Sequence, residues 1–211
     1  MRPRDDSALA AEPAREKQFD ASAPEPRQKL LIVAPMSGHH ATLLRGTVEA
    51  FLPFYDVYIT DWADSRTIPL SAGRFDLDDY IDYLISICEN LSKERDGTIV
   101  HTLGVCQPAV PLIAAIARME ADDSPHVPAS MTLMGGAIDA RQSPTKVNLL
   151  AQQRGSAWFE RNCICVVPFG YPGAGRDVYP GFLQLTGFMA MNIDRHHRAF
   201  GVFRSSRQRR R

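Results

Sequence analysis

Short apolar runs alternate along this chain with segments of helical spacing. Leu30–Ala34 is a continuous apolar run, as expected for a strand buried on both faces. Ala41–Phe51 then has helical spacing, and Tyr55–Thr60 predicts the next strand. The chain therefore begins its folded part, near Lys29, as strand, helix, strand.

The same alternation continues downstream. Asp78 or Asp79 is expected to cap a helix. The apolar face of that helix is predicted to consist of Ile81, Leu84, Ile85 and Cys88. A strand running into Cys106, a helix ending near Met119 and a strand over Ser130–Met134 complete the pattern.

This order predicts an α/β fold with a mostly parallel, doubly wound sheet. In such sheets ligands bind at the carboxyl ends of the strands. Four loops are expected at that edge, although each is also compatible with an ordinary polar connection. They are Pro35–His40, Asp61–Arg66, Gly104–Pro108 and Gly135–Asp139.

Cys106 is the leading candidate for chemistry. The pattern Gly104-x-Cys106-x-Pro108 has the form of a nucleophile elbow, a sharp strand-to-helix turn that exposes a reactive side chain. The following helix N-terminus would favour a thiolate, and the N–H of Gln107 could donate to an oxyanion. The alternative is that Cys106 is a small buried residue at a strand end.

Composition and net charge limit the kinds of partner and cofactor that the chain is expected to bind. With 211 residues, 45% hydrophobic, the chain can bury one substantial core, and its zero net charge gives no pull toward nucleic acid. The four cysteines lack metal-ligand spacing, so neither a metal nor a cofactor is expected. There is no apolar span long enough for a bilayer and no secretory signal, which favours a cytoplasmic location.

Several blocks in order resemble the intracellular polyhydroxyalkanoate (polyhydroxybutyrate) depolymerases, a family of α/β-hydrolases. The blocks are Ala34–Arg45, Tyr58–Trp62, Val105–Pro111, Met134–Arg141 with Ser143–Thr145, and Tyr179–Gln184. The resemblance implies hydrolysis or thiolysis of storage polyester, with Cys106 as nucleophile and association with cytoplasmic granules. Polyester synthases share the cysteine and fold, but their elbow usually closes with glycine, so Pro108 favours a depolymerase.

An oxyanion hole is expected around the Cys106 thiol. Gln107 could supply one N–H, and the loop after the first core strand, with Ser37, Gly38 and His39, could supply the other. Gly38 could also serve only a tight turn. His39 is expected to line the entrance or cap the next helix rather than act as the base.

The expected domain layout has four parts. Residues 1–28 are expected to be a disordered leader, because prolines interrupt them and they lack a periodic apolar face. By the resemblance, 29–145 is the N-terminal half of a hydrolase core and 146–196 the start of a cap region, and the arginine-rich composition marks 197–211 as an atypical tail. The chain therefore looks truncated at both ends, with the C-terminal strands missing. The acid and histidine that follow the nucleophile in hydrolases are not evident. The late candidates are Asp177, Asp194, His196 and His197.

Three functions remain open from the sequence. The first is a thiol-dependent polyester depolymerase that is impaired in this chain, because triad members act as a unit. The second is a non-catalytic granule-binding remnant. The third is a synthase-like acyltransferase that would take its acyl group from acyl-CoA. The sequence does not give the oligomeric state or the acyl acceptor, water or CoA.

Overall fold

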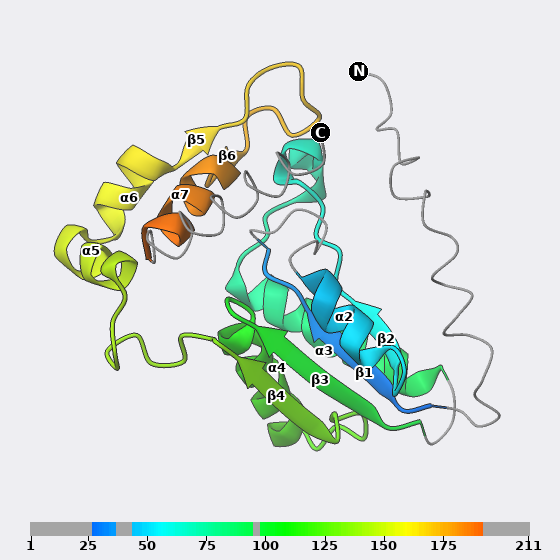
Figure 1. Cartoon of the computed structure of the whole chain (residues 1–211). Coiled ribbons are helices and arrows are strands. Elements are labelled where there is room, and N and C mark those ends of the chain that lie inside the picture. Colours follow the sequence, from blue (N-terminus) through cyan, green and yellow to red (C-terminus); the bar gives the residue numbers. More distant parts are fainter. Residues whose placement is uncertain (1–26, 37–43, 95–97, 192–211) are drawn as a thin grey trace, which may run out of the picture. The chain divides into compact units, whose positions relative to one another are not determined.

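The computed structural model describes residues 27–36, 44–94 and 98–191 (Figure 1). These residues form two compact units. The first contains 27–35, 44–61 and, apart from 95–97, residues 76–136. The second contains Met36, 62–75 and 137–191.

The first unit is built on a four-stranded parallel sheet. Its strands are β1 (Lys29–Val33), β2 (Asp56–Ile59), β3 (Val100–Val105) and β4 (Ser130–Met134), in the spatial order β2-β1-β3-β4. The chain builds outward from β1 to β2, then returns to place β3 on the other side of β1. The predicted α/β class and parallel sheet are therefore confirmed, and the strand order reverses between β1 and β3.

Helices cover both faces of this sheet (Figure 1). Helix α2 (Arg45–Phe51) lies on one face, where Leu44, Val48 and Phe51 pack against alternate residues of β1. Helices α3 (Leu77–Lys93) and α4 (Ala109–Ala121) pack against each other on the opposite face. This two-sided cover explains why every residue of β1 is buried.

Helix α3 begins two residues earlier than a cap at Asp78 would place it, and three residues earlier than a cap at Asp79. The Asp76 carboxylate accepts the N–H groups of Asp78 and Asp79 at 3.0 and 3.2 Å, and the Asp79 carboxylate accepts the N–H of Asp76 at 2.9 Å. This is a capping box, so Asp76 is the N-cap and the prediction of Asp78 or Asp79 is wrong. The buried face of α3 consists of Tyr80, Leu84, Cys88 and Leu91, with Ile81 and Ile85 half-buried beside it.

Strand β4 forms one edge of the sheet. In the described ranges its only strand partner is β3. Met131 and Met134 are 38% and 46% exposed, which is unusual in a parallel sheet. The strand carries neither a charge nor a proline, the residues that commonly protect an edge from pairing with another chain.

The second unit combines helices with a small hairpin. Its elements are the short 3-10 helices η3 (Ser65–Thr67) and η4 (Leu70–Ala72), helices α5 (Lys146–Arg154), α6 (Ser156–Cys163) and α7 (Gly181–Met191), and the antiparallel strands β5 (Cys165–Val166) and β6 (Asp177–Val178). Arg176 joins the hairpin to the η3–η4 segment by donating to the carbonyls of Ile68, Pro69 and Gly73. None of the helices within the described ranges is both long and apolar enough to cross a membrane.

Candidate active site

Cys106 lies directly after β3, at the turn into α4, and its side chain is exposed. Its φ is +66°, a left-handed conformation that is rare for a residue with a side chain. An exposed thiol held in a strained backbone at a strand-to-helix turn is what a nucleophile elbow requires. The alternative of a buried structural cysteine does not fit this exposure.

Two backbone hydrogen bonds hold the Cys106 turn. The N–H of Cys106 donates to the carbonyl of Met134 at 2.8 Å, and the Cys106 carbonyl accepts the N–H of Ala109 at 3.2 Å. Pro108 is buried at the N-cap of α4, where its fixed φ of −63° already suits a helix. The turn is thus fastened to β4 on one side and to the first turn of α4 on the other.

Gly104 lets helix α4 approach β3 closely. A Cβ at this position would lie 3.0 Å from Cδ2 of Leu112 and 3.3 Å from Cδ2 of Leu133. Its φ is not positive, so the requirement is space rather than backbone freedom. The first small residue of the Gly104-x-Cys106 pattern therefore has a steric role in positioning the turn.

The Cys106 turn sits where the strand order reverses. Val33 at the end of β1 is in register with Gly104 in β3, so both strands end at the same level beside each other. In doubly wound sheets the crevice outside such a pair is the usual ligand site. Gln107 follows Cys106 and is exposed, whereas Ser37, Gly38 and His39 lie outside the described residues.

The two histidines within the described ranges are bonded elsewhere. The ring nitrogens of His101, on β3, lie 2.7 Å from Oγ of Ser130 and 3.0 Å from Oε1 of Gln28. Nδ1 of His126 lies 3.0 Å from Oγ of Ser92. His101, Ser130 and His126 all lie toward the amino ends of β3 and β4, so neither imidazole is placed beside Cys106.

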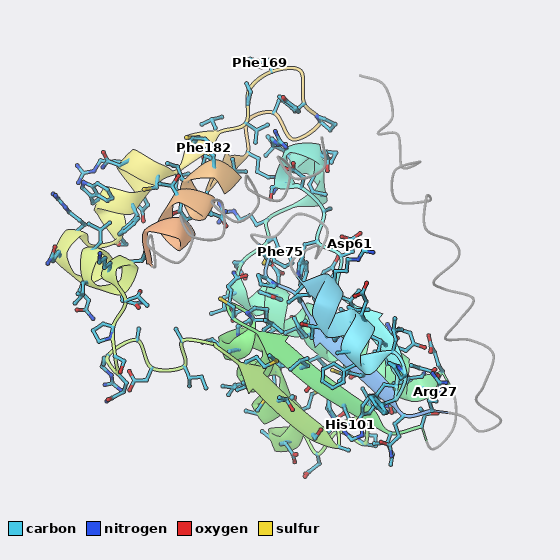
Figure 2. The ribbon with its side chains drawn as sticks, viewed as in Figure 1. Arg27, Asp61, Phe75, His101, Phe169 and Phe182 are labelled. Carbon is cyan, nitrogen blue, oxygen red and sulfur yellow. The ribbon has the colours of Figure 1, made fainter. Side chains whose placement is uncertain are left out.

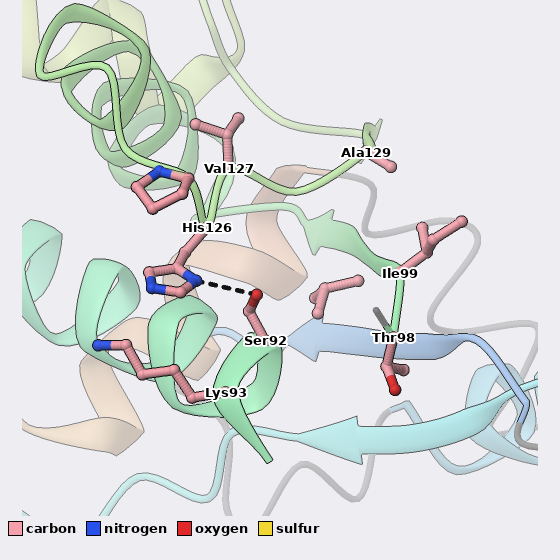
Figure 3. Close-up of a pocket in the computed structure, with 9 residues that line it drawn as sticks. Ser92, Lys93, Thr98, Ile99, His126, Val127 and Ala129 are labelled. Carbon is pink, nitrogen blue, oxygen red and sulfur yellow. Dashed lines mark hydrogen bonds between the residues drawn. The ribbon is translucent and has the colours of Figure 1, made fainter. Parts of the chain in front are cut away.

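The Ser92–His126 pair lines a pocket of about 450 Å³ (Figure 3). The end of α3 and the segments that lead into β3 and β4 form its walls. The pocket thus opens at the amino ends of the strands, opposite to Cys106, and the two sites are separate.

Asp64 and Asp139, one in each of two predicted site loops, pair with arginines two residues away. Arg66 pairs with Asp64, and Arg141 donates to both oxygens of Asp139 at 2.8 and 3.0 Å. The Arg141 guanidinium lowers the pKa of Asp139 below its usual range. Among the described residues no cluster of histidine, cysteine and carboxylate side chains could hold a metal.

Residues 135–209 match the family model described as "PHB de-polymerase C-terminus". The match covers a little more than a third of the chain and begins directly after β4. This part of the chain is therefore similar to the polyhydroxybutyrate depolymerases. No curated protein and no solved structure matches the chain.

The backbone strain at Cys106 gives a prediction about stability. Cys106→Gly should have a free energy of unfolding about 1 kcal/mol above that of Cys106→Ala, because only residues with a Cβ are penalised in the left-handed region. Urea denaturation of the two variants measures the difference. At Cys165, whose φ is not positive, alanine should be the more stable replacement, and the same order at both positions would contradict the strain.

The four thiols should differ in reactivity toward iodoacetamide. Cys106 should react first, Cys165 and the half-buried Cys163 more slowly, and Cys88 last. Burial raises the pKa of Cys88 to about 11, so at pH 8 its thiolate fraction is on the order of 100-fold below that of an ordinary thiol. Peptide mapping of the folded chain after brief labelling gives the order, and early labelling of Cys88 would contradict the fold around α3.

Proposed function

We propose that this chain is a polyhydroxybutyrate depolymerase-type ester hydrolase of the α/β-hydrolase class, with Cys106 as its nucleophile. The observation that carries the proposal is the exposed Cys106 thiol at φ +66° between β3 and α4. The match of residues 135–209 to a depolymerase family model supplies the substrate class.

The topology supports this assignment. Hydrolases of this class carry the nucleophile on a strand-to-helix turn and complete the oxyanion hole from the loop after a neighbouring strand. Here Cys106 follows β3, and β1 is the parallel neighbour in register with it. The loop after β1 contains Ser37, Gly38 and His39, and we infer that it supplies the second donor.

The chemical step uses the thiolate of Cys106. Its Sγ attacks the ester carbonyl carbon, forming a C–S bond and a tetrahedral intermediate whose negative charge is on oxygen. The N–H of Gln107 stabilises that oxyanion. The C–O bond to the alcohol then breaks. The leaving alkoxide takes a proton from water, which balances the proton that the Cys106 thiol gave to solvent when it became the thiolate. Water attacks the resulting thioester and releases a hydroxy acid and the free thiol.

We expect the second step to be slow in this chain. Water attack on a thioester needs a general base, and removal of one triad member costs most of the catalytic rate. His101 and His126, the described histidines, are bonded to other side chains away from Cys106. The late candidates Asp194, His196 and His197 lie outside the described residues. We propose that none of them serves as this base and that the acyl-enzyme accumulates.

The substrate we propose is the amorphous polyester held in cytoplasmic granules. Phe169 is 99% exposed and Phe182 is 67% exposed, and both lie in the segment that matches the depolymerase model (Figure 2). Exposed aromatic side chains of this kind are typical of surfaces that contact apolar partners. They support contact between the second unit and a polymer surface.

The proposal is tested by incubating the 211-residue chain with oligomers of 3-hydroxybutyrate and following the products by mass spectrometry. We expect shortened oligomers in about one equivalent per chain. A parallel incubation with 3-hydroxybutyryl-CoA separates the synthase-like alternative, which predicts faster acylation from the thioester and growth of the oligomer. Intact oligomers in both arms would favour a non-catalytic binding protein.

A further inference from the structure

Gly136 follows the end of β4 by two residues and lies against the Cys106 turn. A Cβ added at this glycine would stand 2.1 Å from Cβ of Ala109 and 2.9 Å from the carbonyl oxygen of Cys106. Real Cβ atoms do not approach other heavy atoms so closely, and both contacts are with parts of the chain that cannot swing aside. Gly136 is therefore packed against both the first residue of α4 and the Cys106 turn that leads into it.

Of the two consecutive glycines after β4, only Gly136 has this tight fit. At the neighbouring Gly135, whose φ is +62°, an added Cβ would meet nothing within 4 Å, and the same holds for Gly46 in α2. Gly136 has no positive φ, so a side chain there is excluded by space alone. Ala109, the main obstacle, is completely buried at the start of α4.

Three contacts therefore fix the Cys106 backbone together. Its N–H donates to Met134, two residues before Gly136; its carbonyl accepts from Ala109; and the same carbonyl lies against Gly136. Together these contacts hold the turn in its left-handed conformation. The side chain on this turn is exposed.

We propose that Gly136 is a positioning residue for the Cys106 nucleophile: its missing side chain lets the end of β4 support the turn that presents the thiol. This inference rests on the proposed function, because it assigns Gly136 a role in the reaction of Cys106. The segment after β4 thus borders the site, beside the turn after β3.

The test is the Gly136→Ala variant in the full chain, with the rate of Cys106 alkylation measured relative to Cys165 in the same sample. A displaced nucleophile should react about tenfold more slowly, since small misplacements of reacting groups have large effects on rate. Gly46→Ala is the matched control and should leave the ratio unchanged. Ala109→Gly, added to Gly136→Ala, removes the closest contact and should restore most of the ratio.

The results of this experiment either support or overturn the proposed role of Gly136. A folded Gly136→Ala chain whose Cys106 reacts at the wild-type rate would overturn it. If Gly136→Ala does not fold, restoration of both fold and Cys106 reactivity by Ala109→Gly supports the proposal, and failure to restore them overturns it. Alkylation does not depend on ester cleavage, so the two proposals can fail separately. If Cys106 of the wild-type chain is never acylated, the proposed function is refuted, but the effect of Gly136 on Cys106 alkylation can still be measured.

Discussion

Cys106→Ala is expected to lower the initial release of alcohol from a p-nitrophenyl ester of 3-hydroxybutyrate by at least about 100-fold, because the variant lacks the only atom proposed to attack the carbonyl. The wild-type chain should release about one equivalent quickly and then slow, since the thioester is expected to persist. Stopped-flow absorbance of p-nitrophenolate measures both phases.

The control for this prediction is Cys165→Ala. Cys165 is also exposed, but it lies on β5 in a strand of ordinary backbone conformation. Its removal should leave the initial release unchanged. Equal losses in the two variants would show that the ester reacts with exposed thiols in general rather than with a positioned nucleophile.

Leu112→Ala should lower the free energy of unfolding by about 3 kcal/mol, because the variant leaves a cavity in the core behind the elbow. Leu112 is fully buried on α4, and its Cδ2 is the atom nearest to the position where Gly104 would carry a Cβ. The side chain therefore fills the interface between α4 and β3. Urea denaturation, monitored by circular dichroism, measures the loss.

Val110→Ala provides the matched comparison on the same helix. Val110 is 43% exposed, so its truncation should change the free energy of unfolding by no more than about 0.5 kcal/mol. Similar losses at Leu112 and Val110 would mean that α4 does not pack on the sheet through the face that contains Leu112.

The strands of the sheet were predictable because the burial of each strand is reflected in the pattern of apolar residues along it. The apolar run Leu30–Ala34 is buried on both faces, and Ser130–Met134 has the predicted strand bounds. The start of α3 was not predictable from the sequence. Asp76, Asp78 and Asp79 are all acceptable N-caps, and only the backbone geometry selects Asp76.

Buried Lys29 shows a different limit of sequence reasoning. Its side chain is 1% exposed, and Nζ donates to the Leu91 carbonyl at 2.6 Å and to Glu94 at 2.7 Å. A lysine before an apolar run is expected at the surface. Its burial depends on the end of α3, which lies more than sixty residues away in sequence, so no local pattern predicts it.

The candidate site was predictable in part. The Gly104-x-Cys106-x-Pro108 pattern marked the turn, but the +66° φ of Cys106 and the support from Gly136 follow only from the packing of β4 beside β3. The two consecutive glycines after Met134 were a usable signal, because glycine next to a strand end often marks a close backbone approach. Ser37, Gly38 and His39 remain predictions.

The assignment of Cys106 as the nucleophile is tested by locating the acyl group after the chain has reacted with 3-hydroxybutyrate oligomers. Acid quenching preserves a thioester, and peptide mass spectrometry identifies the modified residue. We expect a hydroxyacyl adduct on the peptide that contains Cys106, with no adduct in Cys106→Ala and an undiminished adduct in Cys165→Ala. Cleavage of the oligomer with the adduct on another residue, or unchanged cleavage by Cys106→Ala, would show that Cys106 is not the nucleophile.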